Sequence, residues 1–268
     1  MTMELSRSDN LSSNQLINYC LHLADNALIL GHRNSEWCGH GPILEQDIAI
    51  SNISLDLIGH ARNFYQYAAQ LINQTTNQPV NLSTEDTLAY FRDAPDFKNI
   101  LLVEQPIGDW AQTILRQFFF SAYQYLLFEK LQESKDEQIS AIATKSLKEI
   151  TYHRRWSSEW IIRLGDGTEE SRERMVKAID NLWNYTDEMF VPAAYESQMA
   201  NKGICPDVAL LKQSWVKRTT EVFDEATLVI PASSKSSKAG KEGNHSSHLT
   251  DILKELQSVA RVHPAASW

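Results

Sequence analysis

Two histidines, His60 and His153, have the residue type and the helical placement that could bind a metal inside a bundle. His60 falls at the centre of the apolar stripe of its predicted helix, and His153 falls within about 40° of the centre of another. Di-iron bundle proteins take one glutamate from each of two helices and a Glu-x-x-His pair from each of the other two. Because three residues turn a helix by about 300°, the two side chains of such a pair project to one side and can share a metal.

The residues three positions before these histidines cannot complete such a pair. They are Leu57 and Ile150, and neither side chain can donate an oxygen to iron. The other two bundle helices present Ala27 and Ser121 near the middle of their apolar faces, again without a carboxylate. A histidine on an apolar face is also more often a hydrogen-bonded core residue than a ligand. We therefore predict no catalytic residue and no bound metal, but a degenerate site made of Ala27, Leu57, His60, Ser121, Ile150 and His153.

Two acids lie one residue away from the positions that a di-iron site requires. Asp56 precedes His60 by four residues, which is the spacing of neighbours within one helix. Glu149 precedes His153 by the same interval, so we expect each acid to pair with the histidine of its own helix. Lys145, one turn before Glu149, would add positive charge to this core polar network where a metal would otherwise sit. The alternative is that Lys145 points to water.

The elements that position these residues are helices. Apolar residues recur at three- and four-residue spacing along most of the chain, and strict alternation is nearly absent. The predicted helices are residues 13–32, 42–73, 85–91, 109–133 (capped by Asp109), 136–164, 169–190, 206–229 and 249–260. Two long antiparallel pairs joined by the crossover 77–108 predict an all-α, ferritin-like four-helix bundle with additional C-terminal helices.

The length of 268 residues and the hydrophobic content of 43% predict one main domain. Residues 1–12 are expected to form a flexible N-terminus and residues 13–230 the helical domain. Residues 231–248 are rich in Ser, Lys and Gly, so we predict a mobile loop there, because too few apolar side chains are present to hold it folded. Residues 249–268 are expected to add a C-terminal helix and tail to the same domain.

The composition excludes several classes of protein. The formal net charge is −9, whereas proteins that bind the phosphate backbone of nucleic acids concentrate positive charge. The three cysteines form no CxxC pair, so neither a disulfide framework nor a thiolate zinc site is expected. No signal peptide and no stretch of roughly 18 to 20 apolar residues is evident. We therefore expect a cytoplasmic protein with neither nucleic acid nor a membrane as a partner.

Several motifs, taken in order, resemble one known family. Together they resemble the structural C subunits of bacterial phenylacetyl-CoA epoxidases, which are ferritin-like proteins. The resemblance covers most of the chain and leaves out mainly the first dozen residues and the Ser/Lys-rich loop. The motifs are residues 36–42 (EWCGHGP), 55–64 (LDLIGHARNF), 102–106 (LVEQP), 148–153 (KEITYH) and 163–168 (RLGDGT), together with the histidine-containing C-terminal segment that ends in Trp268.

This resemblance implies a multicomponent monooxygenase that forms the ring 1,2-epoxide of phenylacetyl-CoA in aerobic phenylacetate degradation. In such a complex a catalytic di-iron subunit pairs with this subunit, and a reductase with flavin and an iron–sulfur cluster delivers electrons. A small accessory subunit is a further partner. Because the catalytic relative has glutamates where this chain has Leu57 and Ile150, the resemblance implies a subunit that is not an enzyme by itself and holds no cofactor.

The crossover contains the cations that a coenzyme A substrate would need. Arg92 and Lys98 could meet its phosphates in an otherwise acidic protein. We therefore predict that phenylacetyl-CoA lies at the subunit interface and that its coenzyme A portion touches Asp96, Phe97, Lys98 and Asn99. The alternative is a solvated loop.

Two other functions remain open from the sequence. The chain could be an autonomous di-iron oxidase with an irregular ligand set. Its ligands would then be His60, His153, Asp56 and Glu149. The chain could also be a stand-alone helical binding protein with no oxygenase attached.

Overall fold

The computed structural model describes the backbone of most of the chain. The described residues are 2–76, 83–232, 239–264 and 266, and the side chains of residues 2–12 and 76 lie outside that description. All regular secondary structure in the described part is helical, without a strand. None of its helices is long and apolar enough to cross a membrane.

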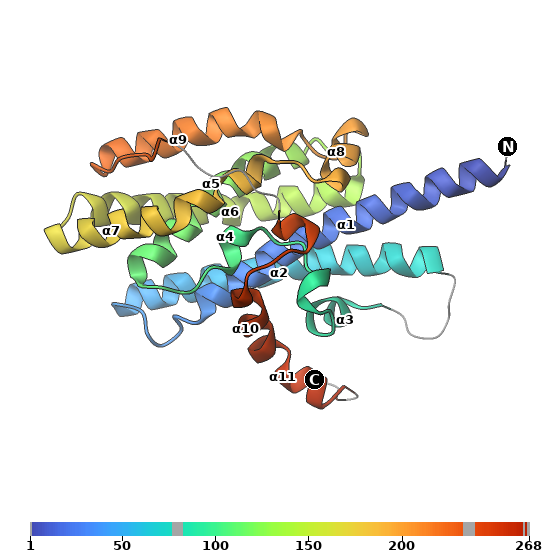
Figure 1. The fold of residues 1–268 in the computed structure, drawn as a ribbon, viewed down its shortest axis with the longest axis horizontal. Helices are drawn as coiled ribbons and strands as arrows, with labels where there is room; N and C mark the ends of the chain where they lie inside the picture. The colour runs from blue at the N-terminus through green and yellow to red at the C-terminus, as the bar shows by residue number, and fades with distance from the viewer. Residues whose placement is uncertain (1, 77–82, 233–238, 265, 267–268) are drawn as a thin grey trace.

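Four long helices form the bundle that the periodicity predicts. They are α1 (Thr2–Ser35), α2 (Leu44–Thr76), α5 (Trp110–Leu131) and α6 (Glu137–Gly165). Helix α1 packs against α2, α5 packs against α6, and α2 also contacts α6 across the bundle (Figure 1). The ferritin-like, all-α fold class is therefore confirmed.

Local signals in the sequence set the ends of these helices. The Asp109 carboxylate accepts a hydrogen bond from the Gln112 amide at 3.0 Å, which confirms the predicted cap of α5. Asp136 caps α6 in the same way, through the Ile139 amide at 2.9 Å. Helix α6 ends at Gly165, where a Cβ would lie 2.4 Å from the Ala226 carbonyl oxygen. Only glycine lets the end of α6 meet the chain beyond α9 so closely.

The crossover between the two helix pairs is a packed segment with helices of its own. It contains α3 (Glu85–Tyr90), the 3₁₀ turn η1 (Ala94–Asp96) and α4 (Leu101–Glu104). Side chains after η1 are buried, among them Phe97, Ile100 and Val103. Helix α4 packs against α1, so the crossover lies along one side of the bundle (Figure 1).

The C-terminal half adds short helices around the bundle. Helices α7 and α9 pack on α5 and α6, and α8 packs on α1. The predicted helix 169–190 is divided after Leu182 into α7 and two 3₁₀ turns. The elements are α7 (Glu169–Leu182), η2 (Trp183–Tyr185), η3 (Asp187–Phe190), α8 (Ala194–Asn201), η4 (Val208–Leu211), α9 (Lys212–Glu225), η5 (Gly240–Glu242), α10 (Ser247–Leu256) and α11 (Ser258–Val262).

Two expected boundaries require correction. Helix α1 begins at Thr2, not near residue 13, because residues 2–12 contain neither glycine nor proline to stop a helix. Within the expected mobile loop 231–248, residues 233–238 lie outside the described part. Residues 239–248 instead form the turn η5 and the start of α10, and Lys241 is fully buried. The cause is an ion pair between Lys241 and Glu196, together with hydrogen bonds from the backbone of this segment to Glu188.

Candidate functional site

The structure places His60 and His153 together inside the bundle, as the apolar stripes predict. His60 lies on α2, His153 lies on α6, and both side chains are buried. The centroids of the two imidazole rings are 6.2 Å apart. The two helices that carry the histidines therefore form one site, which we call the paired-histidine site.

Each of the two acids bonds to a different histidine from the one predicted. Nε2 of His60 lies 2.7 Å from Oε2 of Glu149, on the opposite helix. Nε2 of His153 lies 3.0 Å from Oδ2 of Asp56, again across the bundle. The expectation that each acid pairs within its own helix is therefore wrong. Helices α2 and α6 run antiparallel here, so equal four-residue offsets place each acid level with the other helix's histidine.

These contacts fix the orientation of both rings. A carboxylate only accepts hydrogen bonds, so Nε2 of each histidine is the donor. Nδ1 of each ring is then buried with no hydrogen-bond partner among the described residues. Burial lowers the pKa of His153, and the hydrogen bond to Asp56 opposes that effect only in part. His153 is therefore neutral near pH 7. A metal-binding histidine has the same arrangement, with one nitrogen held by a carboxylate and the other free.

The positions that would supply inward carboxylates carry none. Leu57, Ile150 and Ala27 are buried and apolar. Ser121 is buried as well, and its Oγ lies 3.3 Å from Oγ of Ser157. Two imidazoles without inward carboxylates do not fit a pair of irons, which need several anionic oxygen ligands. In the described residues no group of three or more His, Cys, Asp or Glu side chains could hold a metal ion.

The irregular ligand set does not converge on one point either. The acids approach the rings from outside, and the side chains of Asp56 and Glu149 are 34% and 40% exposed. They occupy the Nε2 atoms, whereas the unpartnered Nδ1 atoms are buried. Lys145 is exposed on α6, and the ion pairs among the described residues include none from its ammonium group. Of the predicted polar network, the structure brings both acids to the histidines and leaves Lys145 facing water.

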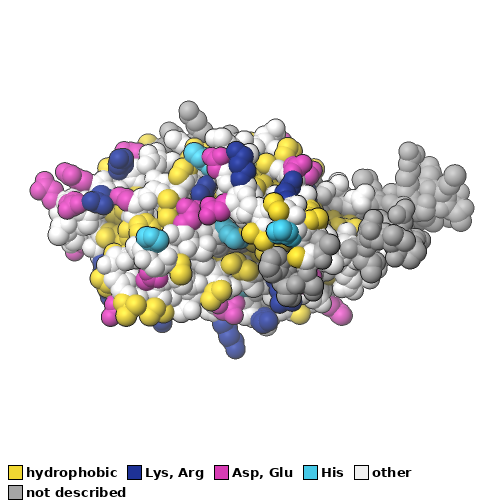
Figure 2. All heavy atoms as spheres, turned by 90° about the horizontal axis from the view of Figure 1, so that it is seen from below, with side chains coloured by type: hydrophobic (Ala, Val, Ile, Leu, Met, Phe, Trp, Pro, Cys, Tyr) yellow, Lys and Arg dark blue, Asp and Glu magenta, His cyan; other side chains and the backbone are white. Residues whose placement is uncertain are grey.

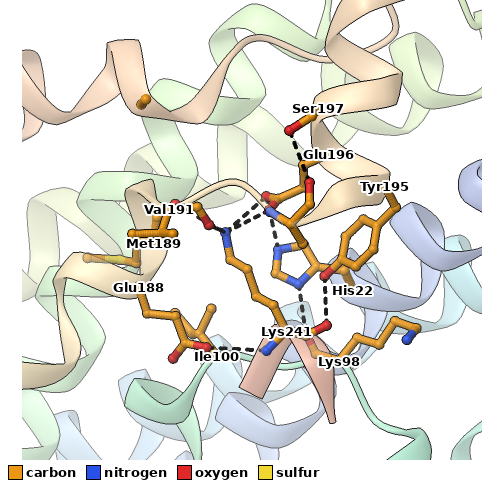
Figure 3. Close-up of polar contacts among 12 residues, drawn as sticks. His22, Lys98, Ile100, Glu188, Met189, Val191, Tyr195, Glu196, Ser197 and Lys241 are labelled. Atoms are coloured by element: carbon orange, nitrogen blue, oxygen red, sulfur yellow. Dashed lines mark hydrogen bonds and ion pairs between the residues drawn. The ribbon is translucent and has the colours of Figure 1, made fainter. Parts of the chain in front are cut away.

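A second polar region lies between α1, the crossover and the C-terminal segment, and it was not predicted. Figure 3 shows Lys241 of η5 reaching towards Glu196 of α8. Nζ of Lys241 lies 2.8 Å and 3.1 Å from the two carboxylate oxygens of Glu196 and 3.1 Å from the Val191 carbonyl. Both charged side chains are buried. We call this region the Lys241 cluster, and its charged and polar members are Lys241, Glu196, Glu188, Glu104, His245, Asp25 and His22.

Glu188 connects the C-terminal segment to the crossover. Its Oε1 accepts hydrogen bonds from the amides of Gly240 at 2.9 Å and Lys241 at 3.2 Å. Its Oε2 accepts one from the Leu101 amide at 2.7 Å. Burial raises the pKa of Glu188 to about 7, although these amides favour the carboxylate. A Cβ on Gly240 would lie 2.3 Å from the Asn99 carbonyl oxygen, so this close approach requires glycine.

Glu104 and His245 form a buried pair in the same region. Nδ1 of His245 donates to Oε2 of Glu104 at 2.8 Å, and Nε2 donates to the Phe97 carbonyl at 2.9 Å. Both ring nitrogens face acceptors, so the imidazole is charged. Burial lowers the pKa of His245, but the hydrogen bond and charge of Glu104 outweigh it, and the pKa is raised overall.

Helix α1 supplies the fourth part of the cluster. Asp25 accepts hydrogen bonds from the Arg92 guanidinium, from the Tyr65 hydroxyl at 2.5 Å and from the Lys98 amide at 2.7 Å. Nδ1 of His22 lies 2.7 Å from the Lys98 carbonyl. The crossover is thus held to α1 by charged and polar groups. One sequence signal could have revealed this contact, because His22, Asp25 and neighbouring Asn26 form a polar stripe within the otherwise apolar stretch 19–30 of α1.

These contacts reduce the number of residues that could form the predicted coenzyme A contact. Phe97 and Asn99 are fully buried, so neither can reach a ligand at the surface of this chain in this conformation. Arg92 is committed to Asp25 and lies 4.2 Å from the centroid of the Phe97 ring. Asp96 is exposed and Lys98 is partly exposed, and both remain candidates. The segment is therefore not the solvated loop that formed the alternative.

Comparison with known proteins agrees with the geometry and with the motifs. The model of the family described as "Phenylacetic acid catabolic protein" matches residues 2–268. The chain is also 44% identical over 255 residues to the C subunit of the 1,2-phenylacetyl-CoA epoxidase of Escherichia coli (strain K12). That match covers 95% of this chain and 100% of the relative. The resemblance predicted from the motifs is confirmed, and the chain belongs to the phenylacetic acid catabolic protein family.

Proposed function

We propose that this chain is a non-catalytic subunit of a 1,2-phenylacetyl-CoA epoxidase, which pairs with and stabilises the catalytic di-iron subunit. One observation carries the proposal. The paired-histidine site keeps the outer carboxylates of a metal centre but has Leu57 and Ile150 where inward glutamates would bind iron. The name of the Escherichia coli relative, which describes a subunit of such an epoxidase, supports the role in a complex.

In this proposal the chemistry belongs to other chains of a cytoplasmic complex. The catalytic partner holds the two irons, and a reductase with flavin and an iron–sulfur cluster supplies electrons. A small accessory subunit is a further partner. This chain contributes a rigid helical face, which keeps the active partner's site in a productive geometry through a large buried interface.

The substrate is expected to lie near the interface between the two bundles. Lys98 is the remaining cation of the crossover that could meet a phosphate of coenzyme A, with Asp96 beside it. Replacement by Lys98→Ala is expected to raise the KM for phenylacetyl-CoA several-fold and leave kcat unchanged, because it removes binding energy far from the reacting ring. An unchanged KM would remove Lys98 from the substrate site.

The deciding experiment measures epoxidation of phenylacetyl-CoA by the catalytic subunit and reductase with and without this chain. We expect the rate to depend on the chain, and we expect the chain purified alone to hold far less than one iron. The proposal fails if the rate is the same without the chain. About two tightly held irons in the isolated chain would instead support the autonomous oxidase. Failure to co-purify with the catalytic subunit would support the stand-alone binding protein.

A further inference from the structure

The first half of α2 exposes an unusual number of large apolar side chains. Leu44, Ile48 and Leu55 on α2, and Ile43 just before it, are 52–72% exposed. They are four of the eleven exposed large hydrophobic residues in the described part of the chain, and they lie within thirteen residues. At about 100° per residue the three helical ones fall within about 40° of one another, which makes a single ridge. Figure 2 shows hydrophobic side chains gathered at its lower left, towards the end of the molecule where α2 begins in Figure 1.

Gly59 continues the same face one turn further along α2. It is exposed, and a Cβ at this position would meet no atom within 4 Å. Gly31 on α1 is different, because a Cβ there would lie 3.2 Å from the Ile58 side chain. Glycine inside a helix is unfavourable compared with alanine. Nothing in the described part of the chain accounts for Gly59, whereas a close approach from outside the chain would.

We propose that this face of α2 (Ile43, Leu44, Ile48, Leu55 and Gly59) docks a helix of the catalytic subunit, an inference that rests on the function proposed above. A ridge of residues about four apart fits the groove of a crossing helix, which is the commonest way for helices to pack. The open space over Gly59 admits a large apolar side chain of that helix. The tryptophan-rich helices offer no comparable ridge. Trp156, Trp183 and Trp215 are buried within the chain, and Trp160 is partly buried and packs against the core.

The charges beside the ridge indicate what kind of helix docks there. Glu45 is exposed next to Leu44, and Asp56 is partly exposed next to Leu55. Each copy of the chain carries a net charge of −9, so a second copy would be repelled from this face. The docked helix therefore has an apolar stripe flanked by Lys or Arg. Because Asp56 also bonds to His153, this docking face borders the paired-histidine site.

The test compares two pairs of exposed leucine and valine substitutions in full-length chains co-expressed with the catalytic subunit. Replacement by Leu44→Ser with Leu55→Ser should weaken association by about 100-fold, because apolar side chains at the centre of an interface carry most of its affinity. The matched control, Leu210→Ser with Val229→Ser, changes side chains that are 75% and 79% exposed elsewhere on the surface and should leave association unchanged. Thermal unfolding of each isolated variant checks that the fold is retained.

The outcomes separate the two proposals. If the wild-type chain binds the catalytic subunit and the α2 variant binds equally well, the docking face is wrong and the subunit role stands. If the wild-type chain does not bind at all, both proposals are overturned. If the isolated wild-type chain is a dimer that the α2 variant abolishes, the occupant is a second copy and the inference is overturned.

Substitution of Gly59 gives a second test, in which stability should rise while association with the catalytic subunit weakens. Replacement by Gly59→Ala should raise the unfolding midpoint of the isolated chain by roughly 2 °C, because alanine favours the helix. The same change should weaken association by about 10-fold, because a methyl group occupies the space that the partner needs. Gln70→Ala, an exposed change further along α2, should leave association unchanged. If the Gly59→Ala variant is more stable and still binds the catalytic subunit as tightly as wild type, the partner helix does not approach Gly59 closely.

Discussion

The paired-histidine site and the Lys241 cluster both bring carboxylates and histidines into a helical interior, but they satisfy them differently. In the cluster the acids Glu104, Glu188 and Glu196 are buried, and cations or backbone amides meet their oxygens. In the paired-histidine site the acids are partly exposed and meet neutral His153 and its neighbour His60, and Nδ1 of each ring lacks a partner among the described residues.

This difference is what we expect if the Lys241 cluster is structural and the paired-histidine site is, as we propose, the remnant of a metal centre. The charged groups of the Lys241 cluster join segments that are distant in the sequence, so the cluster holds the crossover and the C-terminal segment in place. The paired-histidine site joins two helices that already contact each other. Nδ1 of each ring has no hydrogen-bond partner among the described residues, whereas a stabilising network would satisfy both nitrogens. Its geometry matches that of a metal centre whose inner ligands are missing.

The largest expected effect is a gain of metal binding at the paired-histidine site. Replacement by Leu57→Glu with Ile150→Glu restores a Glu-x-x-His pair on both α2 and α6. Because Asp56 and Glu149 already orient the rings, we expect Co²⁺ to bind with a Kd of about 1–10 μM, which is about 7–8 kcal/mol. The visible absorption spectrum of bound Co²⁺ measures this.

The matched control for the rebuilt site is Leu57→Gln with Ile150→Gln, which has the same shape without the charges. We expect no Co²⁺ spectrum from it. A rebuilt variant that is folded by circular dichroism and still binds no Co²⁺ would show that the site lacks the outline of a metal centre, and the contrast with the Lys241 cluster would then weaken.

The next largest effect is loss of stability when Lys241 is removed. Replacement by Lys241→Met leaves the Glu196 carboxylate buried without its cation, so we expect the free energy of unfolding to fall by about 3–5 kcal/mol. Urea unfolding at pH 7 measures the change. Lys254→Met is the control, because that side chain is 74% exposed and only an exposed ion pair is lost. Equal effects from the two variants would contradict the structural role of the cluster.

The two regions should also respond to pH in opposite directions. Burial raises the folded-state pKa of Glu188 to about 7, and Glu104 raises that of His245, so both groups bind protons more tightly in the folded state. Their contribution to stability is complete below the unfolded pKa and is lost as the pH rises through the folded value. The pKa of His153 is lowered by burial, so its contribution is lost as the pH falls below about 6.5.

Glu188→Gln tests the alkaline side of this comparison. One pKa unit is worth about 1.4 kcal/mol. Through Glu188, the free energy of unfolding of the wild-type protein should therefore fall by about 2–3 kcal/mol between pH 4.5 and 8, whereas that of the variant should not show this fall. Urea unfolding at several pH values gives the two slopes. If the free energy of unfolding depends on pH in the same way for wild type and variant, Glu188 is not the group that causes the loss of stability at alkaline pH.

The sequence predicts what is local and misses what depends on register. The long helices follow from periodicity and from caps such as Asp109, and the inward placement of His60 and His153 follows from the same periodicity. The crosswise acid pairs require the antiparallel register of α2 against α6, which no single helix contains. The burial of Lys241 could not be predicted, because a segment rich in Ser, Lys and Gly lacks apolar side chains. Its partners lie 45 or more residues away.

The smallest expected effect is at Asp56. Asp56→Ala removes one hydrogen bond to a neutral histidine at a side chain that is 34% exposed, so we expect a loss of about 1 kcal/mol or less in the free energy of unfolding. Asp56→Asn should cost still less, because its amide oxygen can accept the same bond from His153. Urea unfolding of both variants at pH 7 measures these values. A loss as large as that of Lys241→Met would mean that the paired-histidine site stabilises the bundle, and it could no longer be regarded as a remnant.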